Sequence, residues 1–332
     1  MVNTTSITDL IGKTPLFRYP LANSYGWELY LKLEKFNAGQ SMKDRVALNI
    51  IEQAEQDGRL KKGSTIIESS SGNTATGLAM IAASKGYKFI AIVDNHASSE
   101  KIGVLKAYGA EVIFVKSKNE GHAAMQERRD LGQKLSNDIP NSFYADQANN
   151  PDNPLSYTAM AQEILDEIPN VDILIGAIST GGSLCGTGRS LKKTLPNLKV
   201  IAIEPHGSTI FGKEGRPFFQ SGTGNPPGTV VPENVDYNII DEHGFVSDAE
   251  AFNTARFLAR NFGVLIGGSS GGVVYKALDY INRHNQEKGI VVTIIPDGGE
   301  KYLSSVFNDD WMADKDLLDK KVDDKLRSFS KK

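Results

Sequence analysis

Residues 64–80, STIIESSSGNTATGLAM, contain the local pattern that decides the fold. Their first part, STIIES (64–69), is short and apolar, which predicts a strand covered on both faces. A helical pattern follows over 74–85, and the turn between strand and helix is made of Ser, Gly and Asn. A buried strand that runs through a polar turn into a helix is the repeating unit of a parallel α/β sheet.

The same unit recurs along most of the chain. Further strands are predicted at 88–93, 111–115, 142–145, 172–178, 199–204 and 290–295. Helices are predicted at 44–57, 74–85, 99–108, 121–136, 156–167, 182–194, 248–261 and 271–286. This alternation predicts an α/β protein with mostly parallel sheets.

The length of 332 residues favours two domains over one. The turn-rich stretch NNPDNP (149–154) divides the chain near its middle and is a candidate crossing between domains. The Gly- and Pro-rich segment 206–234 is expected to form a long loop. Loops of that length are uncommon unless they are functional or disordered.

The C-terminal segment 313–332 is rich in charged residues. Leu318, Val322 and Leu326 recur within it at helical spacing, which predicts an amphipathic helix. We expect this segment to form a solvated tail that frays.

The composition argues against several classes of function. With 23% charged residues and a net charge of −3, the chain gives no electrostatic reason to expect nucleic acid as a partner. No apolar run approaches the roughly 18 to 20 residues of a membrane helix, so no membrane span is expected. The N-terminus lacks the basic and apolar regions of a signal peptide. The single cysteine, Cys185, excludes an internal disulfide and fits a cytoplasmic location.

Common nucleotide and metal motifs fail in this sequence. GKT at 12–14 looks like the end of a P-loop, but Ile7 occupies the position of the required glycine. The GTG sequences at 186–188 and 222–224 do not continue as GxGxxG, which disfavours a nicotinamide-binding Rossmann enzyme. The histidines stand alone in sequence, so no metal site is expected.

The segment FNAGQSMKDR (36–45) places a lysine where a cation is unfavourable. Lys43 lies in the first turn of the helix predicted after it, and a helix N-terminus already carries partial positive charge. That location disfavours the ammonium form. It leaves an amine that can act as a nucleophile and a base.

Four polar turns lie at strand ends or helix starts, where open α/β sheets bind ligands. They are ESSSGNT (68–74), ISTGGS (178–183), IGGSSGG (266–272) and PDGGEKYL (296–303). The first suits a carboxylate, and the second, with more glycines and donors, suits a phosphate. Each turn taken alone is also explained by helix capping, close packing or ordinary turn chemistry.

A phosphate site, a carboxylate site and Lys43 together predict a phosphate-bearing aldehyde cofactor held as a Schiff base. Pyridoxal 5′-phosphate (PLP) fits that description. With these motifs in this order, the chain resembles the cysteine synthase (O-acetylserine sulfhydrylase) and cystathionine β-synthase family of fold-type II PLP enzymes. The resemblance extends from IGKTPL at residue 11 to KYLSS at residue 305.

The resemblance implies a tryptophan synthase β-like fold, with two three-layer αβα domains and mostly parallel sheets. Residues 1–43 and 148–312 would form a large PLP-binding domain. Residues 44–147 would form a small mobile domain, and 313–332 a charged tail. The resemblance also implies a homodimer with small amino-acid substrates.

The resemblance further assigns roles to single residues. Lys43 matches the Schiff-base lysine, Asn73 the contact to the cofactor's 3′-oxygen, and Ser269 the partner of its pyridine nitrogen. The cofactor phosphate would be bound by Ser179, Thr180, Gly181, Gly182 and Ser183. The substrate α-carboxylate would be bound by Ser70, Ser71, Gly72, Asn73, Thr74 and Gln147.

The implied reaction is β-replacement on an O-activated L-serine, either O-acetyl- or O-phospho-L-serine, with sulfide as the nucleophile. A neutral Ser269 beside the pyridine nitrogen favours β-elimination through an aminoacrylate. Lys43 would remove the α-proton and return it after the nucleophile has added.

Several positions depart from an ordinary cysteine synthase, among them Ala75 and Asp297. The stretches HGSTIFG (206–212) and TIIPDGGEKYLSSVFNDDWM (293–312) resemble a siderophore-pathway branch. That branch joins O-phospho-L-serine to the amine of L-glutamate, giving N-(2-amino-2-carboxyethyl)-L-glutamate on the way to 2,3-diaminopropionate. The loop at 213–232 would then face the second substrate, although its Arg216 is expected to be solvated. A serine/threonine dehydratase is a further alternative, so the leaving group and nucleophile stay open.

Overall fold

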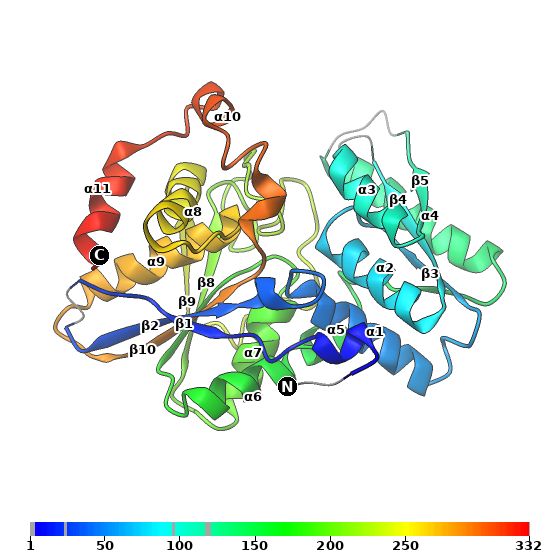
Figure 1. The fold of residues 1–332 in the computed structure, drawn as a ribbon, viewed down its shortest axis with the longest axis horizontal. Helices are drawn as coiled ribbons and strands as arrows, with labels where there is room; N and C mark the ends of the chain where they lie inside the picture. Colours follow the sequence, from blue (N-terminus) through cyan, green and yellow to red (C-terminus); the bar gives the residue numbers. More distant parts are fainter. Residues whose placement is uncertain (1–3, 23–24, 95–96, 117–120, 332) are drawn as a thin grey trace.

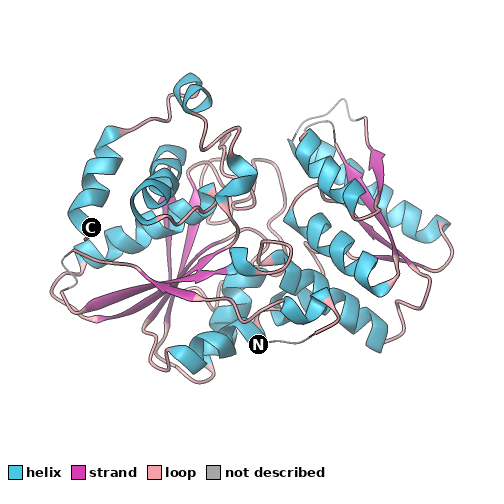
Figure 2. Ribbon diagram, viewed as in Figure 1, coloured by secondary structure: helices cyan, strands magenta, loops and turns pink. Residues whose placement is uncertain are grey.

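The computed structural model describes residues 4–22, 25–94, 97–116 and 121–331, with the side chains of 121–124 left out. Two sheets lie in two adjacent lobes, and each sheet has helices on both faces (Figures 1 and 2). The predicted α/β class with mostly parallel sheets is confirmed.

The larger lobe is built on a six-stranded sheet in which all neighbours are parallel except the first pair. Its strands, in spatial order, are β1 (Leu16–Arg18), β2 (Trp27–Leu33), β10 (Gly289–Ile295), β7 (Ile173–Ala177), β8 (Lys199–Pro205) and β9 (Glu242–Val246). The smaller lobe has a parallel four-stranded sheet. Its strands, in spatial order, are β5 (Glu111–Phe114), β4 (Lys88–Val93), β3 (Thr65–Glu68) and β6 (Ser142–Tyr144).

The helices occupy the segments between the strands and after the last one. They are α1 (Lys43–Gln56), α2 (Asn73–Lys85), α3 (Ser99–Ala107), α4 (Gly121–Asp138), α5 (Asp152–Leu155), α6 (Thr158–Glu167), α7 (Gly182–Lys192), α8 (Asp248–Phe262), α9 (Gly268–Arg283), α10 (Asp309–Asp314) and α11 (Lys320–Phe329). Short 3-10 helices are η1 (Ile7–Leu10), η2 (Glu34–Phe36) and η3 (Gly299–Tyr302).

Alternation along the strands explains the three layers of each lobe. In β8, Val200 packs in the hydrophobic cluster that contains α6 and α7, whereas Ile201 packs with α8 and α9 on the opposite face. In β3, Ile66 faces α1 and α2, whereas Ile67 faces α4. Because both faces of strands such as β3 and β8 are buried, these strands read as continuous apolar runs in the sequence.

Three strands of the larger sheet were not predicted from the sequence. β1 has three residues, and β9 is an edge strand whose Glu242 and His243 are exposed, so neither forms an apolar run. β2 alternates between buried and half-buried side chains instead of being apolar throughout. The helix predicted over 156–167 begins at Thr158, after the separate short helix α5.

A buried ion cluster fixes the start of α1 to the larger lobe. The Arg45 guanidinium donates to the Glu34 carboxylate at 2.7 Å and to the Glu163 carboxylate at 2.7 Å. The Lys32 ammonium, whose side chain is fully buried, also pairs with Glu163 at 2.7 Å. The cluster joins β2, η2, α1 and α6 beside Lys43. Its members are strongly interdependent, because removing one would leave a buried charge without its partner.

The C-terminal segment differs from the solvated tail expected for it. Val322 and Leu326 of α11 are buried against α8 and α9, whereas Leu318 is half exposed. Lys325 of the same helix pairs with Asp279 of α9 at 2.8 Å. The amphipathic spacing was read correctly, but its apolar face packs on the larger lobe.

We predict that Leu326→Ala lowers the free energy of unfolding by about 2 to 5 kcal/mol, because it leaves a cavity in a packed site. Leu318→Ala, the matched control on the exposed side, should change it by less than about 0.5 kcal/mol. Chemical denaturation measures both. Equal, small effects would show that α11 does not pack in solution.

Candidate functional site

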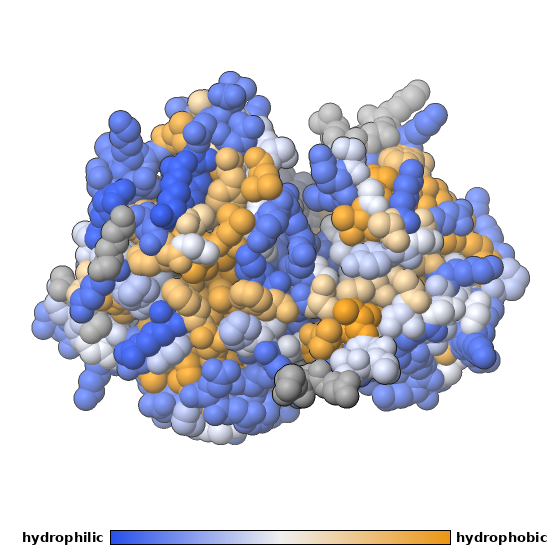
Figure 3. Space-filling model, viewed as in Figure 1, coloured by the Kyte–Doolittle hydropathy of each residue, from blue (hydrophilic) through white to orange (hydrophobic). Residues whose placement is uncertain are grey.

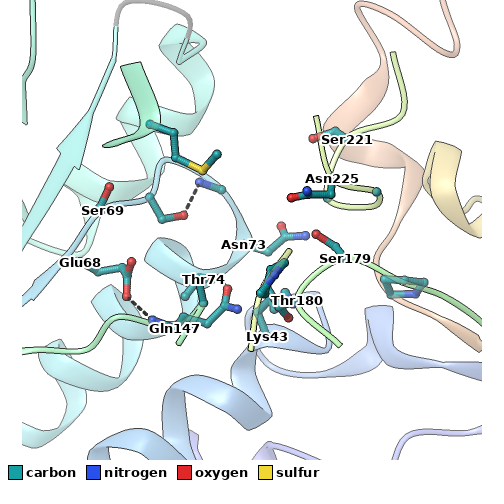
Figure 4. A pocket seen from close by; sticks show the side chains of 18 of the residues that line it. Lys43, Glu68, Ser69, Asn73, Thr74, Gln147, Ser179, Thr180, Ser221 and Asn225 are labelled. Atoms are coloured by element: carbon teal, nitrogen blue, oxygen red, sulfur yellow. Dashed lines mark hydrogen bonds between the residues drawn. The ribbon is translucent and has the colours of Figure 1, made fainter. Parts of the chain in front are cut away.

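A cavity of about 430 Å³ lies between the two lobes. It is lined from the smaller lobe by the end of β3 and the start of α2, and from the larger lobe by the turns after β7 and β10 and the start of α9. Figure 4 shows Lys43 at the floor of this cavity, with Asn73, Gln147 and Thr180 around it. Polar groups therefore approach Lys43 from both lobes.

Four of the helices that start at this cavity have no side chain at the N-cap position that accepts from the helix. This holds for α1, α2, α7 and α9, and the last three are preceded by Gly72, Gly181 and Gly267. Backbone N–H groups in the first turn of a helix have no partner within the helix and carry partial positive charge. Several helices thus offer donors for anionic groups at the same place.

The amine of Lys43 is perturbed by this environment. Burial disfavours the ammonium and lowers the pKa of Lys43 to about 8, although the nearby Asp297 carboxylate acts in the opposite direction. The neutral amine is therefore a far larger fraction near neutral pH than it is for an ordinary lysine, although the ammonium still predominates. The neutral amine is the form that acts as a nucleophile or a base.

A hydrogen-bonded chain crosses from the larger lobe to α2. The Asn73 amide N–H and the Tyr302 hydroxyl both donate to the Asp297 carboxylate at 2.8 Å. The Lys301 ammonium donates to the Asn73 amide oxygen at 2.7 Å. Burial raises the pKa of Asp297 and lowers the pKa of Lys301. The chain fixes which way the Asn73 amide faces.

Donor groups line the smaller lobe's side of the cavity. The Thr74 hydroxyl donates to the Gln147 amide oxygen at 2.7 Å, which leaves the Gln147 Nε2 buried without an acceptor among the described residues. The Ser69 hydroxyl is likewise buried without a partner there. The Ser70 hydroxyl accepts from the Gly72 N–H at 3.2 Å. Unpaired donors of this kind suit a carboxylate ligand.

Glu68 sits behind these donors and was not predicted as a site residue. Its carboxylate accepts from the Gln147 N–H at 3.2 Å. Burial raises the pKa of Glu68 to about 7. Its position at the end of the strand before the serine-rich turn was the only sequence signal for it.

The structure brings most of the predicted site residues to one cavity. Those that line it are Lys43, Ser70, Gly72, Asn73, Thr74, Gln147, Ser179, Thr180 and Ser269. Ser71, Gly181, Gly182 and Ser183 are not among the lining residues. Gly181 has a left-handed φ of 82°, and a Cβ there would lie 2.3 Å from the Asn234 carbonyl oxygen, so only its backbone is available to a ligand. The roles assigned to these residues stay predictions.

The turn after β10 contributes more than the sequence indicated. Asp297, Lys301 and Tyr302 line the cavity, although PDGGEKYL could be read as turn chemistry alone. The loop after β8 lines it too, through residues such as Ser221 and Asn225. Arg216 of that loop is exposed and is not a lining residue.

Within the described ranges, no group of three or more His, Cys, Asp and Glu side chains is placed to hold a metal ion. In the same residues, no helix has the length and apolar character that crossing a membrane requires. Figure 3 shows hydrophilic residues around the rim of both lobes, with apolar residues nearer the centre of the face in view.

The family model of pyridoxal-phosphate dependent enzymes matches residues 7–297. The chain belongs to this family. The predicted family, enzyme class and PLP cofactor are confirmed.

Similar proteins agree with this PLP-enzyme assignment. A putative cysteine synthase from Sinorhizobium fredii is 46% identical over 317 residues, covering 95% of this chain and 94% of the relative. The solved structure of a hydrogen sulfide-producing enzyme from Fusobacterium nucleatum is 36% identical with a TM-score of 0.84, covering 91% of this chain and 98% of that one. The solved structure of an O-acetylserine dependent cystathionine β-synthase from Helicobacter pylori is 34% identical with a TM-score of 0.82. The match covers 92% of this chain and 99% of that one. The fold-type II prediction is confirmed.

The residues of this PLP enzyme fit the cofactor. Lys43 offers an amine with a pKa of about 8 for the aldehyde. The uncapped start of α7, with Gly181 before it, offers backbone donors for the phosphate. Ser269, at the uncapped start of α9, places a neutral hydroxyl at the cavity for the ring nitrogen.

We predict that cofactor-free protein reacts with PLP at Lys43 with a midpoint near pH 8, because the ammonium predominates below that pH and the amine above it. Brief exposure to PLP, borohydride reduction and peptide mass spectrometry at a series of pH values measure the adduct. Lys43→Arg is the control and should show no adduct on this peptide. A midpoint above pH 10 would contradict the prediction.

Proposed function

We propose that this PLP enzyme catalyses β-replacement on an O-activated L-serine bound in the cavity between the lobes. The reaction class predicted from the sequence is confirmed by relatives that include a putative cysteine synthase and an O-acetylserine dependent synthase. The observation that carries the assignment to this cavity is that two lining residues, Gln147 and Ser69, have donors (Nε2 and the hydroxyl) without a partner among the described residues. These donors suit the α-carboxylate of an amino acid.

The cofactor would be held at three points. Lys43 would bind it covalently, the turn 179–183 with the start of α7 would bind its phosphate, and Ser269 would face its ring nitrogen. Asn73, oriented by Asp297 and Lys301, would contact its 3′-oxygen. When bound, the cofactor supplies an electron sink that allows the α-proton and then the oxygen substituent on Cβ to leave.

Lys43 is the proposed base of the reaction. Once released by the incoming substrate, its amine takes the α-proton and later returns it to the same carbon. A base is most effective when its pKa lies near the working pH, and the pKa of about 8 meets that condition.

The substrate would be oriented by its carboxylate. The start of α2 supplies backbone donors, and the Gln147 amide is held by Thr74 with its Nε2 free. Asn153 donates to the Gln147 carbonyl at 2.7 Å and so supports the position of this residue. A carboxylate bound there would lie in the same cavity as the Lys43 amine.

Two nucleophiles compete within this proposal. Sulfide is the one expected from the likeness to cysteine synthases. The amine of L-glutamate is the alternative, and it is supported by Lys101 and Arg129, which line the cavity and would attract a second carboxylate. With either nucleophile, the first substrate is O-acetyl- or O-phospho-L-serine.

A homodimer in the cytoplasm is part of the same proposal. Phe36, Leu155 and Leu303 are each more than half exposed, which leaves apolar surface for a second copy. Light scattering on the purified protein would test the dimer.

We predict that the wild-type protein releases acetate or phosphate from the matching L-serine ester and forms a β-substituted alanine with sulfide or L-glutamate. Mass spectrometry of the four substrate combinations identifies the product. Lys43→Ala should abolish product formation, because it removes both the tether and the base. Leaving-group release undiminished in Lys43→Ala would contradict the role of Lys43.

We predict that Gln147→Leu raises the KM for the first substrate about ten- to hundredfold, because a hydrogen bond to a charged group is lost. Cofactor content, measured by absorbance after gel filtration, should be unchanged. Thr74→Val, which removes only the partner that orients Gln147, should give a smaller rise in KM. An unchanged KM in both variants would place the carboxylate elsewhere.

A further inference from the structure

The loop between β8 and β9 forms the cavity wall opposite the serine-rich turn (Figure 4). It is anchored where β7 ends: the Gly224 N–H and the Thr223 hydroxyl both donate to the Ile178 carbonyl, at 2.7 and 3.1 Å. The fully buried Glu204 carboxylate accepts from the Ser208 hydroxyl at the start of the loop. Hydrogen bonds to the ends of β7 and β8 therefore hold this loop in a defined position as one wall of the cavity.

Asn225 is held rigidly within this wall. Its backbone N–H donates to the Ser208 hydroxyl oxygen at 2.9 Å. Its Nδ2 donates to the Thr209 hydroxyl oxygen at 3.1 Å and to the Thr229 carbonyl at 3.0 Å. Because a carbonyl only accepts, the contact to Thr229 fixes which end of the amide carries the nitrogen.

The other end of the amide is an acceptor that faces the cavity. Asn225 is 5% exposed, lines the cavity, and its Oδ1 receives no hydrogen bond from any described residue. Figure 4 shows the amide end of Asn225 directed into the cavity. An acceptor oxygen that is held in a fixed direction at a cavity wall is placed to receive an N–H or O–H group from a ligand.

The proposed first substrate has no free donor to offer it. The acetyl and phosphoryl leaving groups present acceptor oxygens, the α-carboxylate is an acceptor, and the α-amino group is engaged by the cofactor. A ligand donor to Oδ1 would therefore belong to the second substrate. Hydrosulfide has one weak S–H donor and a negative charge that an amide oxygen repels, whereas an amine has strong N–H donors.

We propose that Asn225 is a specificity-determining residue that binds the nucleophile through Oδ1 and selects an amine. This inference rests on the proposed function and names the nucleophile class for it. One N–H binds Oδ1 while the nitrogen lone pair forms the bond to Cβ. Overall, an amine and O-acetyl-L-serine give an N-substituted 2,3-diaminopropionate and acetic acid. The Cβ–O bond breaks with its electron pair on acetate, and the amine loses one proton.

The test uses the PLP-loaded enzyme with O-acetyl-L-serine and O-phospho-L-serine. Sulfide, ammonia and each proteinogenic amino acid are offered separately, and mass spectrometry identifies the products. The wild type should form an N–Cβ product with at least one amine. In Asn225→Leu the KM for that amine should rise about three- to tenfold, the loss of one neutral hydrogen bond, without an equal rise in the KM for the serine ester.

Two further variants separate binding from loop support. Thr209→Val removes a partner of the Asn225 nitrogen but leaves Oδ1 in place, so the KM for the amine should change less than twofold. Asn225→Asp keeps an acceptor oxygen and should bind the amine better than Asn225→Leu does. The KM for the serine ester, measured on the same Asn225→Leu preparation, shows whether that variant is folded.

Product from sulfide but from no amine in the wild type would overturn the inference. So would an equal rise in both KM values in Asn225→Leu, or a Thr209→Val variant that reproduces it, because either result assigns Asn225 to loop support. If neither serine ester loses its leaving group, the proposed function itself fails, and this inference fails with it.

Discussion

The burial of one amine among helix N-termini is the constraint on which the site depends. Lys43 begins α1, and its pKa is lowered to about 8 because the surrounding protein disfavours the ammonium. The starts of α2, α7 and α9 reach the same cavity without capping side chains. Burial disfavours the cation, and the partial positive charges at these helix starts attract a carboxylate and a phosphate. One physical arrangement thus provides both the reactive amine and the anion sites of a PLP enzyme.

That arrangement requires a rigid attachment between parts distant in sequence. Arg45, two residues after Lys43, is tied to Glu34 and Glu163 in a cluster that also contains Lys32. On the other side, the Asp297 carboxylate accepts a hydrogen bond from Asn73 of α2. The first attachment lies two residues from Lys43 in the chain, and the second ends at the carboxylate that acts on the Lys43 amine. Both attachments therefore lie at the proposed site of chemistry.

The two walls of the cavity differ in hydrogen-bonding character. On the α2 side, Gln147 Nε2 and the Ser69 hydroxyl are donors without partners, which suits the carboxylate of the first substrate. On the opposite side, Asn225 presents an acceptor oxygen. A site that distinguishes two substrates needs such a difference, because an unpaired buried group penalises the wrong ligand more than it rewards the right one.

The sequence by itself determined the α/β class, the PLP cofactor and the place of Lys43. Apolar strands covered on both faces and polar turns at strand ends are local patterns. They can be recognised in the sequence before the fold is known. The sequence did not reveal β1, β2 and β9, or the burial of Val322 and Leu326. The edge strands β1 and β9, the partly alternating β2 and an amphipathic helix all look solvated until their neighbours are known. The parts played by Glu68, Asp297 and Asn225 were decided only by the tertiary structure. Burial, and the direction of an amide, are properties of contacts between segments far apart in the chain.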